Sequence, residues 1–181
     1  CRRHNIAIIR AQTASAHTSV SPMPDIEFRA VTKKDLPLLK RWIATPHWQA
    51  WWGDPEREAA EIAASLDDDA VEPMSSARGG KPVAYVQTYD PHLEDGHPYQ
   101  DQPFGTIGID LSIGEASDLN KGLGTEILTT LAALLFEEGV PRLIIDPHPD
   151  NAAAVRCYEK AGFVAFGTRE RTPFSAAHSA T

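Results

Sequence analysis

A pair of glycines, Gly122 and Gly124, stands in the stretch NKGLGTEILTTL, directly before residues with the apolar spacing of a helix. The first amides of a helix have no intrahelical acceptor, and the helix dipole favours negative charge beside them. Because glycine has no β-carbon, a phosphate can approach the backbone closely at such a turn. The pattern therefore predicts either an anion-binding turn or a simple chain reversal, and the short motif alone does not decide between them.

Two aspartates stand beside apolar segments in positions that suit ligand chemistry. Asp110 interrupts the run GTIGIDLSIG, and strand alternation turns it away from the face that carries Ile107 and Ile109. Asp146 follows the apolar residues RLII and precedes a proline, so it falls at the carboxyl end of a strand, where α/β proteins bind ligands. The alternatives are a solvated strand residue for Asp110 and a turn-capping residue for Asp146.

These residues need a scaffold, and the hydrophobic pattern predicts one. Alternating or buried apolar runs predict strands over 25–32, 81–90, 105–114 and 141–147, with another beginning at 164. Helical spacing and capping residues predict helices from Thr32 to Pro46, from Asp54 to Asp69, over Thr125–Glu138 and from Asn151 to Gly162. The order from Asp25 is β-α-α-β-β-α-β-α-β, which predicts a single mixed α/β domain over residues 23–181.

Three segments do not fit this scheme. MSSARG (Met74–Gly79) stands where a strand should pair with 83–88, yet it is neither alternating nor rich in β-formers. The tail 171–181 also lacks strand character. Residues 1–22 combine basic residues with an apolar run too short for a secretory signal, so we expect a disordered leader or an artefact outside the fold.

Composition limits the partners that the chain can have. Its 181 residues carry a net charge of −8, which argues against nucleic acid or an anionic membrane surface and suits a cationic ligand. No apolar run approaches the ~20 residues of a membrane span. Cys1 and Cys157 make a disulfide framework improbable, so we expect a cytoplasmic protein, and no Cys/His cluster has metal-site spacing.

The glycine turn NKGLGT and the later DPHPDNAAAVRCYEKAGF together resemble the GCN5-related N-acetyltransferase (GNAT) superfamily. The resemblance implies a mixed, mostly antiparallel sheet with helices on both faces and acetyl-CoA as co-substrate. In that family the glycine turn cradles the pyrophosphate, and the later helix lines the pantetheine and the thioester. Leu119 departs from the Gln or Arg usual before the turn. The cofactor-binding residues implied by the resemblance are Leu111, Ile113, Lys121, Gly122, Leu123, Gly124, Thr125, Asn151, Ala154 and Tyr158.

A narrower resemblance, to the aminoglycoside 6'-N-acetyltransferases, covers most of residues 26–169. It rests on the blocks WWG, YVQTYD, GIDLSIG, LNKGLGT, DPHPDN and RCYEKAGF. A sister branch that acetylates N-hydroxylysine in siderophore assembly is similar in the same blocks but tends to carry histidine where Asp110 stands. Asp110 therefore favours the 6'-amine of an aminoglycoside as acceptor. The alternatives are a siderophore precursor or other metabolite amine, and an inactive CoA-binding module, which the irregular segments 74–79 and 171–181 favour.

The resemblance also implies roles for individual side chains. Asp110 is expected to be the base for the acceptor's ammonium or its anchor, and a backbone N–H of the strand 110–113 is expected to contact the acyl oxygen. Tyr158 is expected to protonate the CoA thiolate, with a packed helix aromatic as the alternative. The acidic loop 90–104 would attract a polyamine or is simply solvated. The substrate-binding residues implied by the resemblance are Trp51, Trp52, Gln87, Tyr89, Asp90, Asp110 and Asp146. We expect the protein to be a monomer or a homodimer.

Overall fold

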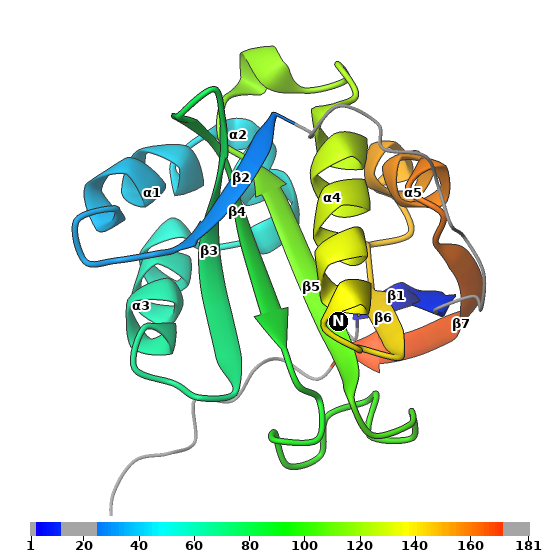
Figure 1. The fold of residues 1–181 in the computed structure, drawn as a ribbon. Helices are drawn as coiled ribbons and strands as arrows, with labels where there is room; N and C mark the ends of the chain where they lie inside the picture. The colour runs from blue at the N-terminus through cyan, green and yellow to red at the C-terminus, as the bar shows by residue number, and fades with distance from the viewer. Residues whose placement is uncertain (1–2, 12–24, 172–181) are drawn as a thin grey trace, which may run out of the picture.

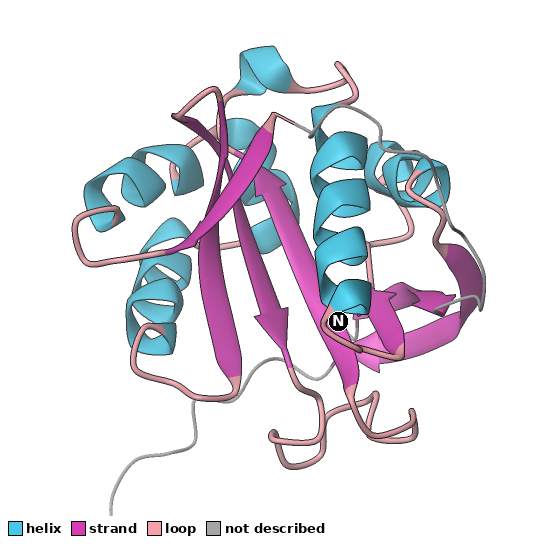
Figure 2. Ribbon diagram, viewed as in Figure 1, coloured by secondary structure: helices cyan, strands magenta, loops and turns pink. Residues whose placement is uncertain are grey.

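The computed structural model describes residues 3–11 and 25–171, which form one seven-stranded sheet with helices on both faces (Figures 1 and 2). The strands are β1 (Arg3–Ala11), β2 (Ile26–Ala30), β3 (Val71–Arg78), β4 (Lys81–Tyr89), β5 (Thr106–Ile113), β6 (Arg142–Ile145) and β7 (Val164–Arg171). The helices are α1 (Leu36–Ile43), α2 (Pro46–Trp52), α3 (Pro55–Ser65), the 3-10 turn η1 (Ala116–Asp118), α4 (Leu123–Glu137) and α5 (Ala152–Lys160). The predicted mixed α/β fold is confirmed.

The sheet order is β2-β3-β4-β5-β6-β1-β7, and five of the six strand pairs are antiparallel. The exception is β5 with β6, which run parallel and are joined by the crossover helix α4. Their pairing extends only from Thr106 opposite Arg142 to Gly108 opposite Ile144. Beyond Gly108, β5 continues for five residues to Ile113 without a partner strand on the β6 side among the described residues. This separation of two central strands creates the space for the site.

Two hydrophobic clusters lie on opposite faces of β4. Ala84 and Val86 belong to the larger cluster, which contains buried side chains of α4 and α5. Tyr85 points the other way and packs with buried residues of α1, α2 and α3, among them Trp42 and Trp48. The period of two along a strand explains this division, since neighbouring side chains leave opposite faces.

The helix signals of the sequence are partly confirmed. Asp54 caps α3 by accepting from Arg57 N–H at 2.9 Å, and Asn151 caps α5 by accepting from Ala154 N–H at 3.1 Å. The first helix was placed too early, because Asp35 rather than Thr32 occupies its N-cap position. Pro46 was predicted only to end the first helix. It stands in the first turn of α2, where its fixed φ is compatible with a helix and its missing N–H is not required.

The irregular segment 74–79 forms a strand, at the place where the sequence calls for a partner to residues 83–88. Residues Val71–Arg78 form β3, which pairs with β2 on one side and β4 on the other. The four residues Pro73–Ser76 are all buried, so both faces of this stretch are covered and alternation has no reason to appear. Backbone hydrogen bonds to two neighbours hold the strand whatever its side-chain pattern.

The expectation of a disordered leader over residues 1–22 does not hold for its first part. Residues Arg3–Ala11 form β1, whose backbone pairs with β6 on one side and β7 on the other. This pairing joins segments more than 130 positions apart, which no local pattern reveals. The expectations for residues 12–22, and for the tail beyond Arg171, concern residues outside those described.

Candidate active site

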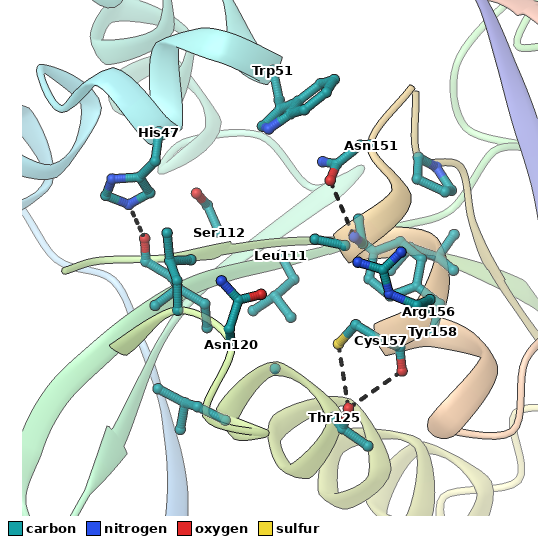
Figure 3. Close-up of a pocket in the computed structure, with 18 of the residues that line it drawn as sticks. His47, Trp51, Leu111, Ser112, Asn120, Thr125, Asn151, Arg156, Cys157 and Tyr158 are labelled. Carbon is teal, nitrogen blue, oxygen red and sulfur yellow. Dashed lines mark hydrogen bonds between the residues drawn. The ribbon is translucent and has the colours of Figure 1, made fainter. Parts of the chain in front are cut away.

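A cavity of about 370 Å³ lies where β5 and β6 part (Figure 3). The carboxyl half of β5 forms one wall, and Ile145 with the loop after β6 forms another. Helix α2 contributes His47 and Trp51 on one side of β5, while Asn120 and Thr125 lie on the other side, at the start of α4. Helix α5 closes the remaining side.

The start of α4 offers unpaired amides to this cavity. Gly122 occupies the N-cap position with φ +83°, and no side chain caps the helix. The helical hydrogen bonds begin with Glu126 N–H to the Gly122 carbonyl at 3.1 Å. The amides of Leu123, Gly124 and Thr125 precede that bond and have no acceptor among the described residues. An L-residue at 122 would be strained by the positive φ, although its β-carbon would meet no atom within 4 Å.

Charged side chains around these amides suit a large anion. Arg156 and Lys160 of α5 both line the cavity. Glu126, in the first turn of α4, forms an ion pair with Arg78 of β3, which compensates a negative charge close to the free amides. Lys121 does not line the cavity; its side chain is 65% exposed and lies 3.8 Å from Asp118.

Helix α5 places Tyr158 in the lining of the cavity. Its side chain is only 8% exposed, and Asn151 fixes the start of the helix two turns earlier. Burial raises the pKa of the Tyr158 phenol, with further increases from Cys157, Asp110 and Asp146. The phenol is therefore neutral and keeps a proton to donate.

Helices α4 and α5 meet at Gly124 and Cys157. Thr125 Oγ1 lies 3.4 Å from the Cys157 carbonyl oxygen and 3.5 Å from Cys157 Sγ (Figure 3). Burial raises the pKa of the Cys157 thiol, against smaller opposing effects of Thr125 and Lys160. Cys157 is thus a neutral packing residue in the cavity wall.

Acidic and aromatic side chains also line the cavity. Asp110 lies on β5 and accepts a hydrogen bond from Gln87 Nε2 at 2.8 Å, while Asp146 follows β6. Trp51 lies 5.8 Å from His148, centroid to centroid, so α2 and the loop after β6 meet at these rings. His47 attaches α2 to the end of β5, because its Nε2 lies 2.9 Å from the Ile113 carbonyl oxygen.

The structure brings together most of the residues singled out from the sequence. The predicted residues that line the cavity are Trp51, Trp52, Asp110, Leu111, Ile113, Gly122, Leu123, Gly124, Thr125, Asp146, Asn151, Ala154 and Tyr158. Lys121, Gln87, Tyr89 and Asp90 do not line it. Tyr89 and Asp90 border a separate hollow of about 140 Å³ at the other end of β4, and the Tyr89 ring covers Gly108. The ligand contacts of all these residues remain predictions.

Several lining residues were missed. His47 was missed because helix α2 was not predicted. Pro46 could have indicated this helix, since proline is common at the first helical position. Ser112 shares a strand face with Asp110, so the alternation of the strand could have identified it as a lining residue. Nothing local marks Asn120, His148, Arg156 or Cys157, because their place depends on how the loops and α5 pack.

The fold and this site define an acetyltransferase. A family model described as an acetyltransferase (GNAT) domain matches residues 31–170, and the chain belongs to this family. The family resemblance, the fold class and the expectation of an acyltransferase enzyme are thereby confirmed.

Individual relatives show which acetyltransferases the chain is similar to. The chain is 35% identical over 152 residues to the aminoglycoside N(6')-acetyltransferase type 1 of Klebsiella pneumoniae, covering 79% of this chain and 76% of that protein. It is 26% identical over 155 residues to the lysine N-acyltransferase MbtK of Mycolicibacterium paratuberculosis, covering 82% and 70%. The solved structure of aminoglycoside acetyltransferase AAC(6')-Ib with coenzyme A and kanamycin superposes with a TM-score of 0.71 at 32% identity, covering 80% and 91%.

Two further properties concern only the described part of the chain. Residues 3–11 and 25–171 contain no group of three or more His, Cys, Asp or Glu side chains that could hold a metal ion. None of the helices in these residues is long and apolar enough to cross a bilayer.

Proposed function

We propose that this protein transfers the acetyl group of acetyl-CoA to the 6'-amine of an aminoglycoside. One observation carries the proposal: a single cavity connects the free amides at the start of α4 with the carboxylates of Asp110 and Asp146. The first region suits a diphosphate and the second suits ammonium groups, and both ligand types occur in the similar solved structure with coenzyme A and kanamycin. The 35% identical relative named for this reaction supports the same acceptor.

The residues around the glycine turn fit the cofactor's diphosphate. The amides of Leu123, Gly124 and Thr125 donate to it, and Gly122 leaves open space in front of them. Arg156 and Lys160 add positive charge from α5. Bound acetyl-CoA supplies an activated acetyl thioester, and Leu111 and Ile113 line the cavity on the same strand as Asp110.

Asp110 binds the acceptor's ammonium and receives its proton. A carboxylate 4 Å from an ammonium contributes about 1 kcal/mol in bulk water and about 4 kcal/mol at the effective dielectric constant near a protein surface. Asp146 adds a second negative charge, and Trp51 and Trp52 provide an aromatic wall for the sugar ring and its amines.

The amine nitrogen bonds to the acetyl carbon, the carbon–sulfur bond breaks, and Tyr158 donates a proton to the leaving thiolate. The second proton that the attacking nitrogen loses then returns to the Tyr158 oxygen. The raised pKa of Tyr158 does not prevent the donation, because the burial that disfavours a phenolate equally disfavours a thiolate beside it. A neutral phenol held on a capped helix is thus a suitable donor within the cavity.

The function is tested by the release of free thiol from acetyl-CoA with a panel of amines. We expect turnover with kanamycin-type aminoglycosides and little with a matched aminoglycoside that carries a hydroxyl in place of the 6'-amine. Preferred turnover of N-hydroxylysine or lysine would instead favour the acyl transfer named for the relative MbtK. Binding of acetyl-CoA without turnover of any amine would favour a binding module, although the segment 74–79 that suggested this forms the paired strand β3.

A further inference from the structure

Asp110 is held by a row of hydrogen bonds that begins outside the cavity. Tyr85 Oη donates to Gln87 Oε1 at 2.7 Å, and Gln87 Nε2 donates to Asp110 Oδ2 at 2.8 Å. Tyr85 and Gln87 share one face of β4, and Gln87 stands opposite Asp110 in the β4–β5 register. A buried phenol is thereby connected to the candidate base through one amide side chain.

Chemistry fixes the direction of both bonds. An ionised carboxylate only accepts, so Gln87 must turn its NH2 group towards Asp110 and its carbonyl oxygen towards Tyr85. Burial raises the pKa of Tyr85 and the charge of Asp110 raises it further, against a smaller opposing effect of a hydrogen bond with Ser65, so the phenol keeps its proton and can donate it to the amide oxygen. With the amide reversed, an oxygen would face the carboxylate. The charge of Asp110 thus sets the amide orientation, and Tyr85 stabilises it by donating to the amide oxygen.

Tyr85 is itself fixed by helix α2. Its side chain is fully buried, with the Trp48 ring at 6.1 Å and the Trp52 ring edge-on at 6.4 Å. Trp52 also lines the cavity. The aromatic wall proposed for the acceptor and the support of Asp110 thus belong to one packed unit.

We propose that Tyr85 and Gln87 are positioning residues that hold the Asp110 carboxylate in the orientation needed to receive the proton of the acceptor amine. This inference rests on the proposed function, because it requires Asp110 to act on the amine. It also gives Gln87 a role different from the substrate contact implied by the resemblance.

A double-mutant cycle tests the connection. We expect Tyr85→Phe and Gln87→Leu each to lower kcat by about tenfold, because each removes one hydrogen bond from a row that ends on a charged group. The Kd for acetyl-CoA should be unchanged. The double variant should be no slower than Gln87→Leu alone, because the hydroxyl acts only through the amide. Multiplicative losses, or unchanged kinetics in both single variants, would overturn the proposal.

The variant Gln87→Glu gives a readout that a purely structural role would not change. It places a second carboxyl group within hydrogen-bond distance of Asp110, and two such groups share a proton. We expect the acid limb of the kcat/KM profile to move up by about one pH unit or more. Gln100→Glu, on an exposed loop, adds the same charge and should leave the limb in place. An unmoved limb in Gln87→Glu would contradict the proposal.

Hydrogen exchange of the Gln87 side-chain amide, measured by NMR without substrates, separates this inference from the proposed function. We expect slow exchange in the wild type and faster exchange in Tyr85→Phe and Asp110→Asn; equal exchange in all three would overturn the arrangement. A protected amide with unimpaired Asp110→Asn turnover would overturn the base and the positioning role together. Impaired Asp110→Asn turnover with normal Tyr85→Phe and Gln87→Leu would overturn the positioning role alone.

Discussion

A β-carbon on Gly124 would lie 2.9 Å from Cys157 Sγ, closer than two such atoms can pack. The start of α4 and the middle of α5 therefore approach as they do only because residue 124 is glycine. Residues on both sides of this contact line the cavity, so its width depends on one missing methyl group.

Gly124→Ala should widen the contact between α4 and α5 and weaken acetyl-CoA binding by about tenfold, equivalent to ~1.4 kcal/mol. The measurement is the Kd for acetyl-CoA by calorimetry. Cys157→Ala in the same chain removes the sulfur and should restore most of the affinity. If the double variant binds no better than Gly124→Ala, the steric explanation is wrong.

Tyr158→Phe should lower kcat by about 10²-fold, the lower range for loss of a general acid, while the Kd for acetyl-CoA stays within about twofold. Steady-state kinetics and calorimetry together measure the two effects. Tyr99→Phe removes a phenol hydroxyl that is also buried but lies outside the cavity, and it should leave kcat unchanged. An equal loss of acetyl-CoA affinity in Tyr158→Phe would assign the hydroxyl a structural role.

Asp110→Asn should lower kcat/KM for the aminoglycoside by about 10²-fold or more, because the amide keeps the shape but loses charge and basicity. Binding of acetyl-CoA should be retained. Asp25→Asn, at an exposed residue that does not line the cavity, makes the same change in net charge. Similar losses in the two variants would show that net charge, rather than Asp110 itself, governs the reaction.

Asp35 is expected to contribute to stability in a pH-dependent way. A hydrogen bond from Arg29 holds the pKa of Asp35 well below its usual range, with Nη1 and Nη2 at 2.8 and 2.7 Å. Since the folded-state pKa is below the unfolded one, the contribution is present above about pH 4 and is lost as the pH falls through the folded-state pKa.

Asp35→Asn should therefore lower the free energy of unfolding at pH 7 by about 1 kcal/mol, and the difference from wild type should shrink below about pH 4. Urea unfolding at pH 7 and pH 3 measures it. Glu27→Gln, an exposed residue on β2, removes the same charge and should have little effect. A deficit that stays constant between the two pH values would exclude the linkage to Asp35.

Local patterns predicted the parts of the fold that are amphipathic and capped. The alternation of β5 correctly turned Asp110 away from the core face that buries Ile109, and Asn151 predicted the start of α5. These features depend on neighbours within a few residues, which a single sequence displays.

Other features depend on neighbours that the sequence does not display. Strand β1 exists through pairing with β6 and β7, and Pro73–Ser76 of β3 are buried on both faces. The contact of Gln87 with Asp110 follows from the register of β4 and β5, which joins residues 23 positions apart. Because the register is a tertiary property, a resemblance could place Gln87 near the site but could not tell which group it touches.

The early separation of β5 from β6 also affects how the protein responds to its co-substrate. A sheet that is open near its middle lacks backbone bonds that a continuous sheet would have, so a ligand seated in the gap holds the two halves together. Acetyl-CoA at a hundred times its Kd would add about 2.7 kcal/mol to the free energy of unfolding. The melting temperature and the resistance to proteolysis would then rise with the cellular supply of acetyl groups.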